Sequence, residues 1–253
     1  FSFAVKDTIR NTYIALVSQP FSNTNINHQD WSTVIPEMVS SYSFLSKKFK
    51  KVFFEYSGSG FTLVPTNFFE VNKQKELFQL TQSLPEYFEL HHTLHNNGES
   101  FVQIFSMPYT LSTAWLKVQP KTKFISPLSS LLFYTGISKS DNLVQVDISS
   151  SKIIVLFHSK EKLIAFNSFD YKTENDIVYY TLGFCKSLNI NFSSVNIHLT
   201  GKLGELQDLQ TLLSNYFAHV SADANYNSIH FSYQLLRHRV KFFRLFNSTA
   251  ICE

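Results

Sequence analysis

The predicted order of strands and helices begins again near the middle of the chain, and this repeat restricts the fold more than any other feature. Alternating apolar residues predict two strands at the start, over residues 1–7 and 13–18. The same kind of pattern predicts three strands after the midpoint, over residues 143–148, 152–158 and 162–169. In each half a helix, a strand and a second helix follow. The repeat is therefore one of architecture, since the two halves have negligible sequence identity.

Apolar residues at three- and four-residue spacing predict the helices, and short apolar runs predict the remaining strands. The expected helices cover residues 31–45, 67–82, 110–118, 128–134, 175–188, 205–217 and 233–246. Further strands are expected over residues 52–56, 61–64, 88–94, 101–106 and 195–199. We therefore expect an α/β protein of two mixed-sheet halves with flanking helices, residues 1–135 and residues 136–253.

Charge and cysteine content limit the class of protein. The 253 residues include 22 Lys and Arg against 19 Asp and Glu, and a net charge of +3 is too small to indicate a nucleic-acid binder. Two isolated cysteines, Cys185 and Cys252, do not form a disulfide framework and favour a reduced, cytoplasmic setting. The longest uninterrupted apolar runs are about the length of residues 153–157. A membrane-spanning helix needs about 20 apolar residues, so we expect no membrane-spanning segment.

The predicted hairpin over residues 144–155 carries the best candidate for a ligand site. Asp147 stands at the end of its first strand, and Ser149 lies in the turn. An aspartate in this place holds metal and phosphate where glycines beside it let backbone N–H groups approach the phosphate. Serines occupy the turn here, so a second interpretation is that Asp147 only caps its own turn.

A second candidate lies at the predicted junction of a strand with a helix, in the segment LTGKLG at residues 199–204. Gly201 and Gly204 would allow a ligand to approach the N-terminus of that helix, which is a natural anion site. The spacing matches neither a phosphate-binding P-loop nor a GxGxxG motif. Ordinary turn glycines are the alternative.

Histidines and the cysteine offer weaker signals. On a helix, His91 and His95 would share a face and suggest a metal site, but the segment alternates like a strand and the ligand set is incomplete. Cys185 lies in a predicted helix beside Phe184, which favours a buried, inert thiol. We therefore expect no metal site, no catalytic residue and no cofactor.

Two basic segments stand out. On the predicted C-terminal helix, Arg237, Lys241 and Arg244 would share one face and could contact RNA phosphates or an acidic partner. A solvated helix face is the alternative. The other segment, KKFKK at residues 47–51, follows the predicted helix of residues 31–45. Lysines there would interact favourably with the negative end of the helix dipole, and a binding patch is the other interpretation.

Four segments carry a resemblance to a known family: FTLVPT at residues 61–66, FNSF at residues 166–169, Tyr179-Tyr180, and LTG at residues 199–201. On these, the chain resembles the actin-like ATPase superfamily, and more narrowly an uncharacterised bacterial family assigned to that fold. The resemblance spans nearly the whole chain. It implies a duplicated actin-like (ribonuclease H-like) fold.

The phosphate-binding loops of that superfamily are incomplete in this chain. An Asp-x-Gly loop is expected in the opening hairpin, where the sequence reads Lys6-Asp7-Thr8-Ile9 without a glycine. The second loop, after Asp147, also lacks glycine, and Gly201 and Gly204 are what remains of an adenosine-site pair. The resemblance therefore implies the fold while making ATP hydrolysis doubtful.

These observations lead to one expected function and two alternatives. With 26 Phe, 12 Tyr and 2 Trp but few charges, the chain has aromatic side chains available for an interface. We expect a non-catalytic interaction or scaffold protein that binds a protein partner or itself, with nucleic acid and membrane not expected as partners. A nucleotide-binding protein or weak ATPase is the first alternative, and an RNA-associated protein is the second.

Overall fold

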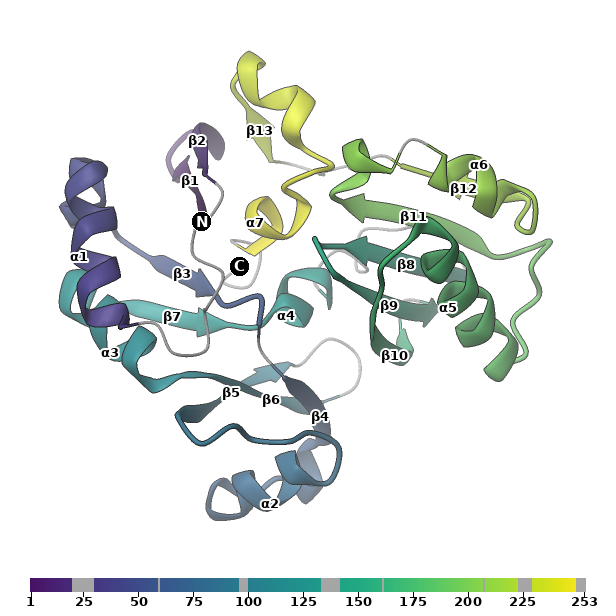
Figure 1. Cartoon of the computed structure of the whole chain (residues 1–253), viewed down its shortest axis with the longest axis horizontal. Helices are drawn as coiled ribbons and strands as arrows, with labels where there is room; N and C mark the ends of the chain where they lie inside the picture. Colours follow the sequence, from purple (N-terminus) through teal and green to yellow (C-terminus); the bar gives the residue numbers. More distant parts are fainter. Residues whose placement is uncertain are drawn as a thin grey trace. The chain divides into compact units, whose positions relative to one another are not determined.

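The structure is a computed structural model that describes residues 1–19, 30–58, 60–95, 100–132, 142–160, 162–206, 208–222 and 229–248 (Figure 1). Its contacts divide the chain into two compact units. Unit 1 comprises Phe1–Gln19 and Ser130–Glu253, and unit 2 comprises Pro20–Ser129. Among the described helices, none is long and apolar enough to span a bilayer.

Unit 1 is built on a five-stranded mixed sheet and a three-stranded sheet. The strands of the larger sheet run in the order β10-β9-β8-β11-β12, with β8, β9 and β10 antiparallel and with β11 parallel to both β8 and β12. The smaller sheet has the order β1-β2-β13. Their bounds are β1 (Ser2–Asp7), β2 (Thr12–Ser18), β8 (Asn142–Ile148), β9 (Lys152–Ser159), β10 (Lys162–Asp170), β11 (Asn196–Gly201), β12 (His219–Ser221) and β13 (His230–Phe231).

Two helices, α5 (Glu174–Ser187) and α6 (Leu209–Ser214), cover one face of the five-stranded sheet (Figure 1). α5 begins at a capping box, in which Thr173 and Asp176 each accept a hydrogen bond from the other's backbone N–H. The core between helices and sheet is aliphatic and aromatic, and its fully buried members include Val146, Val155, Ile177, Leu199 and Phe217.

The other face of the same sheet is buried but partly polar. Gln145 and Asp147 on β8, His158 on β9, and His198 and Thr200 on β11 are all at most 4% exposed. The short helix α7 (Phe243–Asn247) packs against β11 and β1. Its Phe243 ring meets the His198 ring edge-on at 6.1 Å. Polar groups buried in this way need partners inside the fold.

Unit 2 contains two smaller sheets, each with its own helices. A parallel pair, β3 (Val52–Glu55) with β7 (Thr122–Ile125), packs against α1 (Trp31–Ser41) and α3 (Tyr109–Val118) around Trp31, Ile35 and Trp115. An antiparallel sheet of order β4-β6-β5 packs against α2 around Phe78 and Ile104. The remaining bounds are β4 (Phe61–Pro65), α2 (Gln74–Gln79), β5 (Phe88–His95), β6 (Phe101–Pro108) and α4 (Pro127–Leu132), the last crossing into unit 1.

Every predicted strand is present, and the helices over residues 31–45, 110–118 and 175–188 are confirmed in part or in full. The helix predicted over residues 67–82 is wrong in its first half, which forms two 3₁₀ turns, Thr66–Phe68 and Val71–Lys73. The helix predicted over residues 205–217 is reduced to α6, preceded by the 3₁₀ turn Leu203–Glu205. The helix predicted over residues 128–134 is described only as far as Leu132.

The single C-terminal helix predicted over residues 233–246 is also wrong. A 3₁₀ helix, η7 (Tyr233–His238), and α7 replace it, with a turn between them. The carbonyl of Val240 accepts hydrogen bonds from the N–H groups of Gly201 at 3.0 Å and Phe243 at 3.3 Å. Because this carbonyl is bound to β11 and to a residue three positions on, the α-helical ladder is interrupted there.

The predicted division of the chain at residue 135, into the two halves of a duplicated fold, stays a prediction. The packing units follow a different partition, since the opening hairpin β1–β2 belongs to unit 1 together with the second half of the sequence. The pairing of β13 with β2 explains this grouping, because two backbone segments separated by more than two hundred residues form one sheet.

Candidate functional site

Asp147 lies at the end of β8 and is only 2% exposed. Thr200 stands directly opposite it on β11, and the Thr200 hydroxyl donates to Asp147 Oδ1 at 2.7 Å. The guanidinium of Arg244 on α7 reaches the second oxygen, with Nε 3.3 Å from Asp147 Oδ2. Both carboxylate oxygens are therefore engaged by side chains of the protein itself, and the negative charge is balanced inside the fold.

The turn after Asp147 is closed by its own serines. The backbone N–H and the hydroxyl of Ser149 both donate to the carbonyl of Lys152, at 2.9 and 2.7 Å. Tyr171 supports the turn from outside, with its hydroxyl donating to the Ser149 carbonyl at 2.6 Å and its N–H donating to the Ser151 carbonyl at 3.0 Å. The N–H of Ser149 thus serves the turn and is not directed at a ligand.

Gly201 ends β11 in the left-handed region, with φ of 90°. A Cβ atom at this position would lie 2.1 Å from the carbonyl oxygen of Ile148, which no L-residue could tolerate. The next residue, Lys202, donates its N–H to that same carbonyl at 2.8 Å, and its ammonium donates to the hydroxyl of Ser150 at 2.7 Å. The glycine is therefore needed for the close approach of two strand ends.

The structure brings together only part of the predicted site. Asp147, Ser149 and Gly201 lie at the adjacent ends of β8 and β11. Gly204 lies in the 3₁₀ turn Leu203–Glu205, where nothing is within 4 Å of an added Cβ atom. It therefore does not share the packing constraint that fixes Gly201.

The basic residues predicted to share a helical face are separated. Arg237 is exposed in η7, where its Nε donates to His238 Nε2 at 3.2 Å, and Lys241 is exposed in the following turn. Arg244 is directed to Asp147. The prediction that these three residues share one helical face is wrong, because the helix that would align them is interrupted at Val240. The proposed contact of Arg237 and Lys241 with a partner stays a prediction.

Sequence reasoning missed two buried polar residues on the same face of the sheet as Asp147. Neither Gln145 nor His158 forms a side-chain hydrogen bond within the part of the chain that the structure describes. Burial lowers the pKa of His158 to about 4, because the charged imidazolium loses its hydration. The signal was present in the sequence as polar residues at the apolar positions of buried strands, but position alone does not distinguish an inward from an outward side chain.

The histidines of the metal hypothesis lie on the strand β5, as the alternation predicts. They have different partners: His91 contacts Glu89 at 2.9 Å, His92 contacts Gln74 at 3.1 Å, and His95 contacts Gln103 at 3.1 Å. No group of three or more potential metal ligands occurs among the described residues. The described cysteine, Cys185, is fully buried, and burial raises the pKa of its thiol to about 12, which makes it a poor nucleophile. Cys252 lies outside the described residues.

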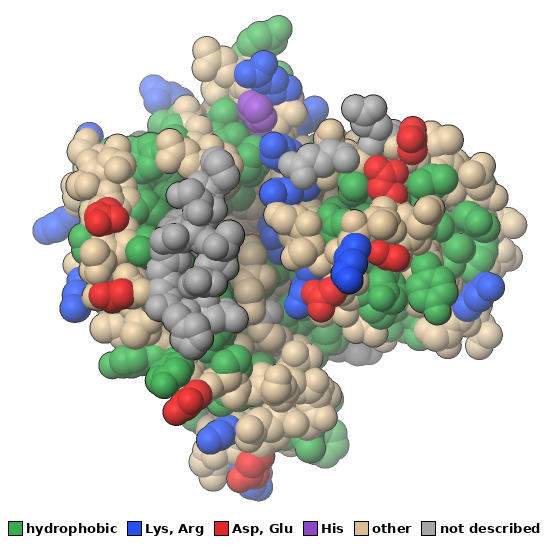
Figure 2. Space-filling model, viewed as in Figure 1, with side chains coloured by type: hydrophobic (Ala, Val, Ile, Leu, Met, Phe, Trp, Pro, Cys, Tyr) green, Lys and Arg blue, Asp and Glu red, His purple; other side chains and the backbone are tan. Residues whose placement is uncertain are grey.

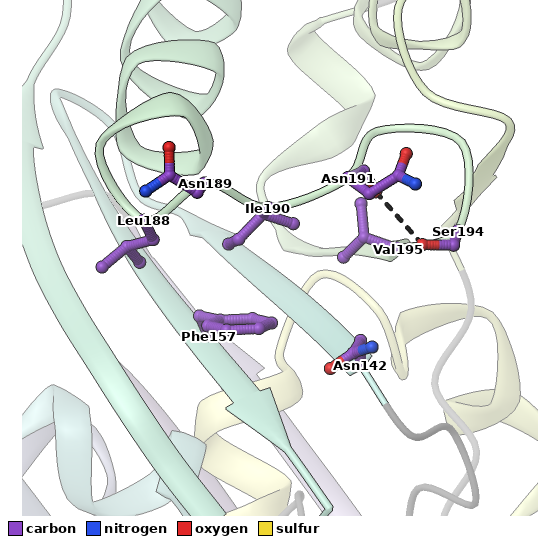
Figure 3. A pocket seen from close by; sticks show the side chains of 8 residues that line it. All are labelled: Asn142, Phe157, Leu188, Asn189, Ile190, Asn191, Ser194 and Val195. Carbon is purple, nitrogen blue, oxygen red and sulfur yellow. Dashed lines mark hydrogen bonds between the residues drawn. The ribbon is translucent and has the colours of Figure 1, made fainter.

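A small cavity of about 170 Å³ opens between the end of α5 and the five-stranded sheet (Figure 3). Figure 3 shows Phe157 beneath Ile190, with Asn142 at one end of the cavity. Its lining consists of apolar side chains, amides and one hydroxyl, without a charged group: Asn142, Phe157, Leu188, Asn189, Ile190, Asn191, Ser194 and Val195. The lining therefore offers no acid or base for reaction chemistry, and none that could activate the Ser194 hydroxyl.

The arrangement around Asp147 is suited to holding the fold together. A metal ion coordinated by this carboxylate would need oxygen atoms that Thr200 and Arg244 already engage. A phosphate would need free N–H groups in a turn whose first N–H is used internally. The geometry therefore favours a buried ion pair that fixes α7 against the sheet.

Comparisons with known proteins agree with this architecture. A protein of unknown function with an actin-like ATPase fold from Bacteroides thetaiotaomicron matches with a TM-score of 0.79 and 19% identity, over 100% of this chain and 91% of that one. The PilM–PilN type IV pilus biogenesis complex contains a chain that matches with a TM-score of 0.64 and 9% identity, over 100% and 95% of the two chains. At these identities the likeness shows the fold, which is actin-like, as the sequence predicts.

Comparison with family models gives a match over residues 1–220, to a family described as a protein of unknown function, DUF3822. No curated protein matches the chain. The family match covers most of the sequence and includes Asp147 and Gly201. The chain belongs to the DUF3822 family of proteins of unknown function.

Proposed function

We propose that this chain is a non-catalytic interaction or scaffold protein on a degenerate actin-like fold, and that Asp147, Ser149, Gly201 and Gly204 are the remains of a nucleotide site. The observation that carries the proposal is the ion pair between Arg244 and Asp147. The carboxylate in the position of a metal organiser is neutralised by a side chain of the same molecule. With its charge balanced and both oxygens engaged, it has little affinity left for Mg-ATP.

A structural neighbour supports a protein as the partner. PilM, in the PilM–PilN complex, is found together with another protein, and the match extends over the full length of this chain. An actin-like fold of this size therefore serves in at least one case as part of a protein complex. We propose the same kind of role for this chain, in the cytoplasm, without transferring the identity of the partner.

The surface offers apolar side chains for such contacts. Figure 2 shows hydrophobic side chains at several places on the face in view. The largest exposed fractions among the described apolar residues belong to Ile9 at 95%, Tyr233 at 88%, Leu80 at 79% and Tyr179 at 72%. Exposed aromatic residues are typical anchors of protein interfaces, because their burial stabilises a complex at little cost in side-chain entropy.

Phosphate release from Mg-ATP tests the absence of catalysis. We expect the wild-type protein to release no more phosphate than the buffer does, because the turn after Asp147 has no glycine to direct N–H groups to the γ-phosphate. The matched control is Asp147→Asn, which removes the charge and retains the shape. Magnesium-dependent release that is lost in this variant would overturn the proposal.

A further inference from the structure

Four lysines, Lys47, Lys48, Lys50 and Lys51, form a compact basic segment in unit 2, here called the lysine segment (residues 47–51). All four are exposed, and Phe49 between them is half-buried, with its ring 6.2 Å from that of Phe44. No acidic residue interrupts the segment. The lysines form two adjacent pairs, Lys47 with Lys48 and Lys50 with Lys51, on the two sides of Phe49. Neighbouring charges along the segment therefore lie within about one Debye length, about 8 Å at physiological salt, and attract a partner jointly.

A helix dipole does not explain most of these lysines. α1 ends at Ser41, and the 3₁₀ turn that follows it ends at Ser46, with no basic residue in the last turn of either element. The dipole's influence falls off within the last turn of a helix, so Lys48, Lys50 and Lys51 lie beyond its reach. Charge at a helix end therefore accounts for Lys47 alone, which caps the 3₁₀ turn, and leaves the other three lysines unexplained.

Internal ion pairs do not explain three of the four lysines either. Among the residues that the structure describes, Lys47, Lys48 and Lys50 take part in no ion pair. Four like charges within five residues repel one another and destabilise the free protein slightly. An external anion would relieve this repulsion as well as pair with the ammonium groups.

The backbone that carries the lysines is held in place. Gln119, only 6% exposed, donates from its side-chain amide to the carbonyls of Leu45 at 2.5 Å and Lys47 at 2.8 Å. The N–H of Lys47 donates to the carbonyl of Phe44 at 3.0 Å, and the side chain of Leu45 is buried. At its other end the segment leads into β3, which begins at Val52. A partner would therefore bind a backbone that is already ordered, which lowers the entropic cost of binding.

We propose that the lysine segment is a docking site for an acidic segment of a partner protein. The assignment rests on the proposed function and specifies the chemistry of the partner. Lysine ammonium groups are point charges that suit carboxylates at the rim of a protein interface. Single-stranded nucleic acid binds most tightly where bases stack on a free aromatic ring in addition to the phosphate contacts, and Phe49 is half-buried against Phe44. An anionic membrane attracts such lysines through charge alone, but stable anchoring takes a second signal such as an exposed apolar side chain, and the segment has none.

Fluorescence anisotropy with a labelled poly-glutamate peptide tests the assignment on the full chain. The test variant carries K47E, K48E, K50E and K51E. The matched control carries K121E, K160E, K172E and K186E, which changes the net charge equally at exposed lysines dispersed over the chain. We expect the test variant to bind at least about tenfold more weakly than wild type, and the control to change binding by less than about threefold. A variant with four arginines in the segment should bind like wild type, and its melting temperature shows that the fold is retained.

Equal loss of binding in the test and control variants would contradict the proposal, because the site would then be general positive charge. Anionic vesicles containing phosphatidylserine and a single-stranded RNA are measured in parallel. Tighter binding of either one than of the peptide, with the same dependence on the four lysines, would overturn the assignment to an acidic polypeptide. None of these outcomes bears on ATP, so a failure here is distinct from a failure of the proposed function.

Discussion

At the scale of single residues, Arg244 determines whether a carboxylate is tolerated at the buried end of β8. Removing the guanidinium leaves Asp147 with Thr200 as its hydrogen-bond donor in a site that is 2% exposed. We predict that Arg244→Met lowers the free energy of unfolding by about 3 kcal/mol, because a buried charge loses its counter-ion. Urea denaturation measures this loss.

The double variant Asp147→Asn with Arg244→Met is the control for that prediction. It removes both charges, so its loss should be clearly smaller than the sum of the losses in the two single variants. Strict additivity, or a loss below about 0.5 kcal/mol in Arg244→Met, would show that the ion pair does not hold α7 to the sheet.

His158 gives the fold a stability that depends on pH. Its pKa is lowered from 6.5 to about 4 in the folded protein by burial. The unfolded chain therefore binds more protons than the folded one between these two values, and the free energy of unfolding falls as the pH falls through that window. Protonation of His158 lowers the free energy of unfolding by about 3 kcal/mol in total, and this loss is complete below about pH 4.

We predict that His158→Leu flattens the dependence of the free energy of unfolding on pH between about 6.5 and 4, measured by urea denaturation at several pH values. Burial also lowers the pKa of His95, so a weaker dependence of the same sign should remain in the variant. An unchanged slope would mean that the His158 ring is protonated or solvated in the folded protein.

At the scale of elements, two glycines in unit 1 should respond to alanine with opposite signs. Gly201 ends β11 with φ of 90° and has the Ile148 carbonyl where a Cβ would stand, so Gly201→Ala should destabilise by at least about 3 kcal/mol. Gly183 lies within α5 with nothing near an added Cβ, so Gly183→Ala should stabilise by about 0.5–1 kcal/mol. Melting curves of the two variants measure both, and an equal response would contradict the close approach of β11 to β8.

The sequence predicts the strands of this fold but not all of its helices or the partner of Asp147. Alternating residues predict the strands, because burial of one face requires the two-residue period. The interruption of the C-terminal helix was not predictable, since it depends on a hydrogen bond between Val240 and Gly201. The sequence offers Asp147 and Gly201 as two separate candidates that only the family resemblance links. The parallel pairing of β8 with β11 brings their strand ends side by side. The sequence predicts Arg244 on a face shared with Arg237 and Lys241, because only the folded chain brings its guanidinium to Asp147.

At the scale of the whole molecule, this chain retains an actin-like fold while the parts that would hold a nucleotide are used internally. The fold match extends over the full chain, and the family match over residues 1–220. The proposed loss of nucleotide binding involves local features alone: serines rather than glycines in one turn, and the arginine that balances the charge of Asp147. On this proposal the fold is the same with and without the ligand, because function belongs to a site and not to the fold that carries it.

The most direct test of this account is the melting temperature of the full chain with and without Mg-ATP. A ligand that binds the folded state alone raises the melting temperature, by the equivalent of about 2.7 kcal/mol at one hundred times its dissociation constant. The account predicts no magnesium-dependent rise at millimolar Mg-ATP, in the wild type or in Asp147→Asn. A rise in the wild type that is lost in Asp147→Asn would show that the carboxylate is available to a magnesium-bound nucleotide. That result would contradict the claim that Arg244 already neutralises Asp147.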